Sequence, residues 1–332
     1  MELLPLLFQH FNSPWADQVR PWREFGGMMQ DIVKAAQILI DGGLVAFPTE
    51  TVYGLGADAT NDRAVARIYE AKGRPQFNPL IAHVTDVEEA FAQAEFSAAA
   101  LTLAARFWPG PLTLVLPRKN GCTVSLLASA GLPSIALRVP QHPLALELIR
   151  GVARPVVAPS ANPFGRISPT TAAHVREGLG DKVDYILDGG PCAVGLESTI
   201  VSLLDDTPRL LRVGGLIREN IEEALGRELA APVAGPLHAP GQLESHYAPL
   251  ASMRLNATQW QEGEARLGFG AMDAGLNLSR SGDLVEAAAN LFSMLHQLDT
   301  LGSSTIAVAL IPSTGLGEAI NDRLRRAAAP RA

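Results

Sequence analysis

The sequence predicts an α/β protein with a large, twisted, mixed sheet, followed by a second and smaller α/β domain. Short apolar runs typical of buried strands recur over residues 44–213, and alanine- and leucine-rich helical stretches separate many of them. Several of these runs follow one another directly, which argues against a purely alternating βαβ chain. After residue 226 the pattern becomes rich in proline and glycine, and new strand and helix patterns begin near residue 251.

The elements of the larger region can be assigned in order. A first helix starts near Gln30 and ends at Gly42-Gly43, and "LVAF" then forms a short strand. A helix over residues 62–71 is capped by Asn61 or Asp62 and closed by Gly73. Further helices are expected around residues 101–107 and 144–149. The later strands are expected in "LIAHV", "LTLVLP", "IALRVP", "PVVAPSA", "YILDGG", "TIVSLL" and "RLLRV".

Residues 227–250 form a linker by composition, and residues 251–332 form the smaller domain. The strand "ARLGFG", an amphipathic helix, the strand "TIAVALI" and a final helix are expected there. One face of the amphipathic helix is apolar and consists of Leu284, Ala288, Leu291, Leu295 and Leu298.

Composition restricts the class of protein. The chain has 332 residues, 47% of them hydrophobic, and a formal charge of -7, which argues against a protein that grips nucleic acid by charge alone. Two cysteines form neither a disulfide framework nor a four-cysteine zinc site. The first 28 residues look like an extension without the features of a signal peptide, and Met28 or Met29 could be the true start. Since no run is long and apolar enough to span a membrane, we predict a cytoplasmic protein with no membrane contact.

Two clusters of polar residues follow predicted strands or helices. In "AKGRPQFNPLIAHV", Lys72 and Arg74 lie at a helix end, and Asn78 lies on a proline-stiffened loop that leads to His83. Two cations and an amide in this position suit a phosphate clamp, although positive charge at a helix end is favourable in any case. In "VVAPSANPFGRISPTT", Ser160 and Asn162 follow a strand and suit the binding of phosphate, ribose or a base edge. Thr170 or Thr171 is expected to cap the next helix.

Two further clusters point to an anionic ligand. The "GLESTIV" stretch places Glu197, Ser198 and Thr199 at the start of a strand, and Arg138 and Arg212 lie inside apolar strands. A buried arginine needs an anionic partner, which could be an internal carboxylate such as Glu50 or Glu197. Together with Lys72 and Arg74, the two arginines predict a basic cavity whose obvious occupant is ATP.

Six motifs in order resemble the threonylcarbamoyl-AMP synthase family and its YrdC-like domain. They are "PTETVYGLG", "AKGRPQFNPLIAHV", "SIALRVP", "APSANPFGRISPT", "GLESTIV" and "LLRVGG", and "SHYAP" with the small last domain resembles the longer, two-domain branch. The resemblance implies a twisted α/β sheet with a concave basic cavity over residues 29–226, and a small Rossmann-like domain at the C-terminus. It also implies that residues 227–250 serve as an active-site lid.

The resemblance further implies the reaction and its residues. L-threonine, bicarbonate and ATP, which brings Mg²⁺, would give threonylcarbamoyl-AMP and pyrophosphate. The product would pass to a tRNA threonylcarbamoyl transferase complex for modification of tRNA beside the anticodon, and contact with tRNA itself is allowed but not required. Lys72 and Arg74 would face phosphate or bicarbonate, and Arg138 would grip the threonine carboxylate through two hydrogen bonds. The implied threonine-binding residues are Thr51, His83, Arg138 and Ser198. The implied ATP-binding residues are Arg74, Asn78, Ser134, Ala158, Ser160, Ser168, Arg212 and Tyr247.

Two rival functions remain at this point. A hydrogenase-maturation carbamoyltransferase uses a similar domain, but it needs zinc-finger and transferase modules that two cysteines and 332 residues do not accommodate. A non-catalytic protein that binds double-stranded RNA, for example in ribosome assembly, could use the same basic cavity. The acidic balance of the chain and the lack of interleaved aromatic residues argue against it.

Overall fold

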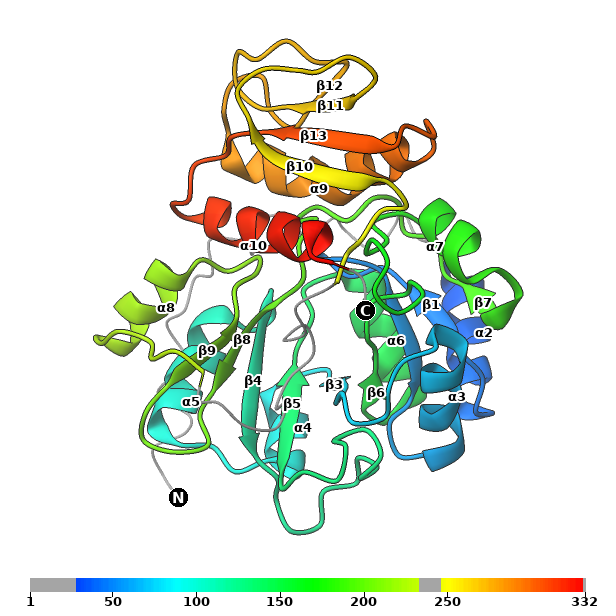
Figure 1. The fold of residues 1–332 in the computed structure, drawn as a ribbon. Coiled ribbons are helices and arrows are strands. Elements are labelled where there is room, and N and C mark those ends of the chain that lie inside the picture. The colour runs from blue at the N-terminus through cyan, green and yellow to red at the C-terminus, as the bar shows by residue number, and fades with distance from the viewer. Residues whose placement is uncertain (1–27, 233–245, 331–332) are drawn as a thin grey trace.

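The computed structural model describes residues 28–232 and 246–330, which form a large mixed sheet and a smaller parallel sheet (Figure 1). Residues 1–27 of the expected extension and residues 233–245 of the expected linker lie outside the described residues. Within the described residues, no helix is both long and apolar enough to cross a membrane.

The large sheet has nine strands and mixes parallel and antiparallel pairs, as predicted. Parallel pairing joins β1 to β7, β3 to β5 and β4 to β8, and the other neighbours are antiparallel. In spatial order the strands are β7 (Tyr185–Ile186), β1 (Val45–Phe47), β2 (Gly54–Asp58), β6 (Val156–Val157), β3 (Ile81–His83), β5 (Ser134–Arg138), β4 (Leu112–Pro117), β8 (Thr199–Ser202) and β9 (Arg209–Arg212).

Helices pack around this sheet and begin and end where the sequence provides caps. Asn61 accepts hydrogen bonds from two backbone amides at the start of α3, and Gly73 closes that helix in the left-handed conformation. Thr171 caps α7 in the same way as Asn61 caps α3. The helices are α2 (Met28–Ile40), α3 (Asp62–Lys72), α4 (Val87–Gln93), α5 (Ala98–Phe107), α6 (Pro143–Val152), α7 (Ala172–Leu179), α8 (Arg218–Leu225) and the 3₁₀ turn η3 (Gly180–Lys182).

The C-terminal domain is built on a four-stranded, fully parallel sheet with the order β10-β13-β11-β12. The two long helices, α9 (Leu284–Asp299) and α10 (Leu316–Ala328), carry many of its buried apolar side chains, and the predicted apolar face of α9 is largely buried. The strands are β10 (Ser252–Ala257), β11 (Ala265–Gly268), β12 (Leu276–Asn277) and β13 (Thr305–Ala309).

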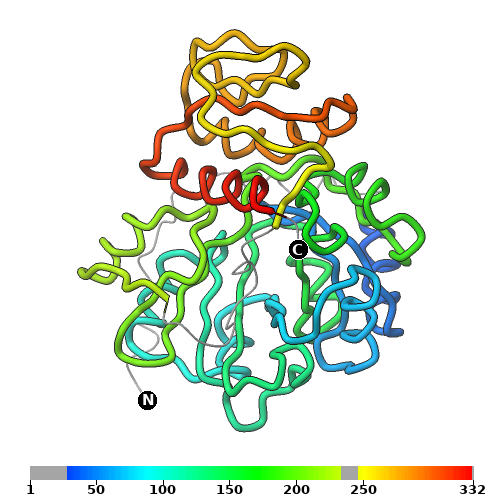
Figure 2. Tube along the Cα trace, in the orientation of Figure 1, coloured from blue at the N-terminus to red at the C-terminus, as the bar shows by residue number. Residues whose placement is uncertain are grey.

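The two domains share one apolar cluster. Val52, Ile167 and Leu196 of the larger domain are buried together with Tyr247 and with side chains of α9 and α10. Figure 1 shows α10 lying between the two sheets, and Figure 2 shows the same helix running beside the green segments of the larger domain. The last helix of the chain is therefore part of the domain interface.

Sequence reasoning missed several elements. Strand β2 was not predicted, because "GLGAD" has two glycines and no β-branched residue, yet it pairs with both β1 and β6. Added Cβ atoms on Gly54 and Gly56 would lie 3.0 Å from the Cβ of Ala158 and 2.8 Å from the Phe47 ring, so both glycines allow close packing of the sheet. Helices α4 and α8 and strands β10 and β12 were also missed.

Candidate active site

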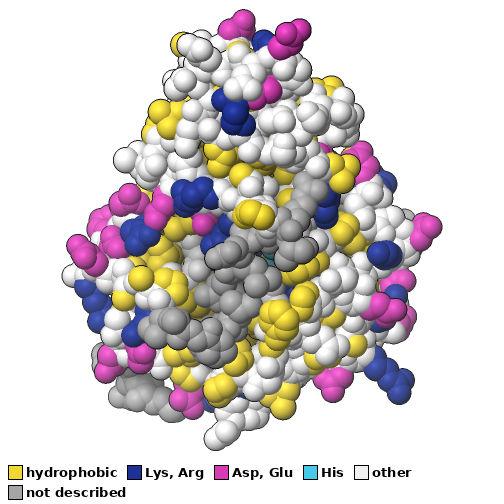
Figure 3. All heavy atoms as spheres, in the orientation of Figure 1, with side chains coloured by type: hydrophobic (Ala, Val, Ile, Leu, Met, Phe, Trp, Pro, Cys, Tyr) yellow, Lys and Arg dark blue, Asp and Glu magenta, His cyan; other side chains and the backbone are white. Residues whose placement is uncertain are grey.

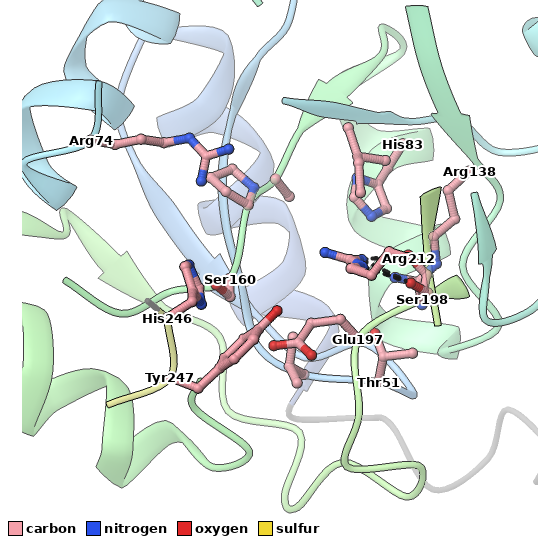
Figure 4. Close-up of a pocket in the computed structure, with 14 residues that line it drawn as sticks. Thr51, Arg74, His83, Arg138, Ser160, Glu197, Ser198, Arg212, His246 and Tyr247 are labelled. Carbon is pink, nitrogen blue, oxygen red and sulfur yellow. Dashed lines mark hydrogen bonds between the residues drawn. The ribbon is translucent and has the colours of Figure 1, made fainter. Parts of the chain in front are cut away.

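A pocket opens where several strands of the large sheet end against residues 246–247 (Figure 4). Its empty volume is about 490 Å³, including the opening to solvent. Three arginines and one glutamate supply its charged groups. The lining residues are Thr51, Val52, Arg74, Ile81, His83, Arg138, Ala158, Pro159, Ser160, Glu197, Ser198, Arg212, His246 and Tyr247.

The loop after β1 forms one wall, and the polar residues that follow Pro48 fix its shape. Thr49 Oγ1 donates to the carbonyl oxygen of Val52 (2.7 Å) and lies 2.8 Å from Thr51 Oγ1. Behind this loop, Glu50 Oε1 accepts a hydrogen bond from Arg138 Nη2 (2.7 Å), and both side chains are buried. The crowded hydroxyls and carboxylate of this motif therefore hold the loop and one pocket arginine in place.

The loop between α3 and β3, residues 73–80, forms a second wall of the pocket. Arg74 points into the pocket while its Nη2 donates to the carbonyl oxygen of Pro79 (3.0 Å). Lys72 does not reach the pocket, because its Nζ donates to the carbonyl oxygens of Ser160 and Asn162 at 2.5 Å each. We expected Lys72 to face phosphate or bicarbonate. The structure instead places its ammonium inside the wall, where it holds the loop that carries Ser160.

The strands β8 and β9 supply a third wall. Arg212 donates from Nε and Nη2 to the carbonyl oxygen of Ser198 (3.0 and 2.9 Å), and from Nη2 to Ser198 Oγ (3.1 Å). Ser198 Oγ also lies 2.7 Å from Thr113 Oγ1 on β4. These bonds fix the guanidinium beside the pocket before any ligand binds.

Most of the residues predicted for the site meet in this pocket. Asn78, Ser134 and Ser168 are buried but do not line it, and Ser168 Oγ donates to Glu197 Oε1. Arg138 uses two of its five N–H groups within the wall, because Nε donates to the carbonyl oxygen of Gly110 and Nη2 to Glu50. The alternative partner considered for a strand arginine, an internal carboxylate, is thus confirmed for Arg138 with Glu50.

Buried polar atoms without a hydrogen-bond partner gather at this site. Among the described residues such atoms are the Oδ1 of Asn78 and Asn162, the Nδ1 of His83 and His246, and Nη1 of Arg118. His83 and His246 line the pocket. Asn78 belongs to the loop whose carbonyl oxygens bind Arg74, and Asn162 belongs to the loop whose carbonyl oxygens bind Lys72. Buried polar groups in native proteins are nearly always paired, so this concentration indicates groups that await a polar ligand.

Comparison with known proteins identifies the family. Residues 37–214 match a family model described as "Telomere recombination", and residues 216–329 match one described as "Threonylcarbamoyl-AMP synthase, C-terminal domain". The chain is 41% identical to a threonylcarbamoyl-AMP synthase of Bacillus subtilis, covering 90% of this chain and 93% of that protein. The chain belongs to the threonylcarbamoyl-AMP synthase family.

Further matches agree with this assignment, and the resemblance noted in the sequence is confirmed. A synthase of Pyrococcus abyssi is 42% identical over 88% of this chain and 92% of its own length. The crystal structure of P. abyssi Sua5 complexed with L-threonine superposes with a TM-score of 0.83 at 40% identity, covering 90% of this chain and 94% of that one. The family assignment makes the chain an enzyme of the nucleotidyltransferase type.

Burial sets the charge states in the synthase pocket. Burial, together with the charge of Arg138, lowers the pKa of His83 to about 3, so its imidazole is neutral near pH 7. Burial lowers the pKa of Arg74 and of Arg212 to about 10, which leaves both guanidinium groups charged. Burial also lowers the pKa of Lys72 well below its usual value.

Sequence reasoning did not assign five lining residues to the synthase site: Val52, Ile81, Pro159, Glu197 and His246. Glu197 and His246 had a usable signal, because each directly precedes a residue that was assigned. Among the described residues, no group of three or more His, Cys, Asp or Glu side chains could hold a metal ion.

Proposed function

We propose that this chain condenses L-threonine, bicarbonate and ATP to threonylcarbamoyl-AMP and pyrophosphate. The observation that carries the proposal is a pocket with three fixed arginines and several unpaired buried polar atoms, in a chain whose relatives are named for this product. Such a pocket suits a ligand with several negative charges and many hydrogen-bonding groups.

ATP is proposed to bind with its phosphates between Arg74 and Arg212. The two side chains line the same pocket from different walls (Figure 4), and both are held by carbonyl oxygens. Ser160 and the backbone at Ala158 would contact the nucleoside, and Tyr247 would cover it, as the lid interpretation requires. The predicted residues that do not line the pocket would support its walls without touching ATP; they are Lys72, Asn78, Ser134 and Ser168.

Threonine is proposed to bind beside Thr51, His83 and Ser198. A neutral His83 can accept or donate a hydrogen bond without adding charge. Arg138 would bind the threonine carboxylate by charge and through the N–H groups that its bonds to Gly110 and Glu50 do not use. The relative from P. abyssi was crystallised with L-threonine, which supports this amino acid as the substrate.

The chemistry needs positioning more than covalent help. The amine of threonine attacks bicarbonate and water leaves, which gives a carbamate. A carbamate oxygen then attacks the α-phosphate of ATP, and the bond to pyrophosphate breaks. Fixed arginines can stabilise the charge that develops on the phosphates, and correct orientation contributes up to roughly 7–11 kcal/mol in ideal cases.

The pocket does not fit a metal ion held by the protein alone. Glu197 is the one carboxylate among the lining residues, and both of its oxygens are already bonded. We therefore propose that Mg²⁺ arrives on the phosphates of ATP, and no step is assigned to it. Transfer of the product to a tRNA threonylcarbamoyl transferase complex completes the proposal.

The rival function, binding of double-stranded RNA, receives less support. On the face shown in Figure 3, Lys and Arg side chains alternate with Asp and Glu and do not form a broad basic surface. A protein that binds the phosphate backbone needs such a surface.

Substrate dependence of pyrophosphate release tests the proposal. The purified protein should release pyrophosphate from ATP when L-threonine and bicarbonate are both present, and omission of either should reduce release to background. Release that ignores threonine, together with tight binding of double-stranded RNA, would favour the rival function.

A further inference from the structure

Arg323 is a fully buried arginine of the C-terminal domain that reaches the wall of the pocket. It lies on α10, and its side chain is 0% exposed. A charged side chain is rarely buried to this extent unless several partners compensate the loss of water. The partners of Arg323 therefore identify the groups that this arginine holds in place at the domain interface.

These partners belong to three different segments that form the pocket. Arg323 Nε donates to Glu197 Oε2 (2.8 Å), and Nη2 donates to the carbonyl oxygen of Val213 (2.9 Å), next to Arg212. The guanidinium carbon lies 5.1 Å from the ring centroid of Tyr247, a cation–π distance. Figure 4 shows Glu197 and Tyr247 pointing toward one another at the edge of the pocket.

Arg323 also balances the charge of Glu197. Burial alone would raise the pKa of Glu197, but Arg323 and, less strongly, Arg212 lower it. Ser168 donates to the other carboxylate oxygen, and Asp322 on α10 binds Arg323 itself. The negative charge of Glu197 is thus compensated from α10 and not by Arg212 alone, which the proposed function assigns to ATP phosphate.

The neighbouring backbone supports the same contact. A Cβ on Gly195, two residues before Glu197, would lie 2.4 Å from the carbonyl oxygen of Ala288 on α9. Leu196 is buried in the apolar cluster shared by the two domains. The two residues before Glu197 are therefore packed against the C-terminal domain, next to the ion pair.

We propose that Arg323 is a positioning residue of the active site. From α10 it fixes the carboxylate of Glu197 and the ring of Tyr247, and it keeps the charge of Glu197 from weakening Arg212 as a phosphate ligand. The C-terminal domain is then required for a competent ATP site. This inference deepens the proposed function and rests on it for the identity of the ligand.

The test compares Arg323→Gln with a matched variant, Arg218→Gln. Arg218 pairs with Glu318, so it also joins the larger domain to α10, but this pair is half-exposed and lies outside the pocket. Arg323→Gln should lower kcat/KM for ATP by about 30-fold or more, mostly through KM. Its loss of kcat/KM should be largest near neutral pH and should shrink at acidic pH, because protonation of Glu197 removes the charge that Arg323 no longer compensates. Arg218→Gln should lower kcat/KM for ATP by no more than about threefold and should leave its pH dependence unchanged.

The double variant Glu197→Gln with Arg323→Gln separates positioning from stability. If Arg323 compensates Glu197, the double variant should lose less activity than the product of the two single losses, and the dependence of the loss on pH should disappear. If Arg323→Gln does not fold, kcat/KM for ATP and its pH dependence can be compared in the double variant and in Arg323→Lys instead.

Equal losses in Arg323→Gln and Arg218→Gln, in proportion to melting temperature and the same at every pH, would overturn the inference. Equilibrium dialysis of ATP against the same variants separates this failure from that of the proposed function. If the parent protein binds ATP but makes no threonine-dependent product, the proposed function is wrong. The ATP affinities of the variants would still test the role of Arg323.

Discussion

Arg74, Arg138 and Arg212 are each anchored by a backbone carbonyl oxygen of a neighbouring segment, those of Pro79, Gly110 and Ser198. Each guanidinium therefore has a fixed place before substrate binds. Preorganised charge of this kind stabilises a transition state without the cost of reorienting the group during the reaction.

Replacement of Arg74 by alanine tests the role of this charge. Arg74→Ala should cost on the order of 2–4 kcal/mol in transition-state stabilisation, by analogy with loss of one preorganised donor. Steady-state pyrophosphate release, read as kcat/KM for ATP, measures the loss. A rate within threefold of the parent would show that Arg74 does not contact the phosphates.

At the residue scale, sequence reasoning found the pocket residues better than their contacts. Asn61 and Gly73 were readable as caps because capping depends on local chemistry. Lys72 and Arg74 looked equivalent in sequence, yet Lys72 bonds to carbonyl oxygens about ninety residues away. A contact of that kind depends on which loops the fold brings together, and a local pattern does not reveal it.

At the scale of elements, the loop before β8 and the helix α9 depend on one another. Gly195 has a φ of +73°, and an added Cβ would meet the backbone of Ala288 and Ala289. Both the left-handed conformation and the lack of space require glycine here.

Gly195→Ala should push this loop away from α9 and destabilise the protein by about 2 kcal/mol or more. Gly302→Ala is the matched control, because Gly302 has a φ of +70° but no atom within 4 Å of an added Cβ. Melting temperatures and pyrophosphate release should fall much further for Gly195→Ala. Equal effects would mean that backbone strain alone explains both changes.

The helices α7 and α9 meet through two stacked imidazoles, and this contact should be sensitive to pH. The rings of His174 and His296 lie 4.0 Å apart, and burial and the neighbouring imidazole lower the pKa of His296 to about 4. Between this value and the ordinary histidine pKa the unfolded chain binds more protons, so stability rises with pH in that window. The free energy of unfolding should fall by roughly 2 kcal/mol between about pH 7 and pH 5 from His296 alone.

Denaturant unfolding at both pH values measures this change. His296→Gln should remove much of the slope of stability against pH. His142→Gln, which alters a half-buried histidine outside this contact, should leave the part of the slope due to the stacked pair in place. An unchanged slope in His296→Gln would contradict the assignment.

Strands were not predicted where hydrogen bonding to neighbouring strands, and not amino-acid composition, determines the structure. In β2, Gly54 and Gly56 are poor strand formers, but β1 and β6 occupy both of its edges and all five of its residues are buried. Tertiary pairing overrides propensity in such a strand. Strands with ordinary apolar runs, such as β4, were found directly.

At the scale of the whole molecule, the two domains form one unit around the pocket. The larger domain is expected to depend on the smaller one, because removal of α9 and α10 would expose Val52, Ile167 and Leu196 and leave Glu197 without Arg323.

A chain ending at Gly226 should be less stable than the parent by on the order of 5 kcal/mol, at about 1.5–3 kcal/mol for each apolar side chain exposed. It should also lose adenylate formation. Chemical unfolding and pyrophosphate release of the truncated chain check both expectations. Full activity in a stable truncated domain would show that the interface serves another purpose.

The family motifs in the sequence were sufficient to predict the fold class and most residues that line the pocket. They did not predict the contacts that join the two domains around it. Arg323 lies 126 residues from Glu197 and sits among other arginines of an amphipathic helix. Nothing in that helical pattern distinguishes it from the exposed Arg325, so its role becomes visible only when α10 is packed on the larger domain.

Direct detection of the product tests the central claim. The full-length protein would be incubated with ATP, L-threonine and isotopically labelled bicarbonate, and the mixture analysed at once by mass spectrometry. The account predicts an AMP adduct that contains threonine and carries the bicarbonate label, formed together with pyrophosphate. An adduct without the label, or ATP cleavage with no threonine-containing adduct, would contradict it.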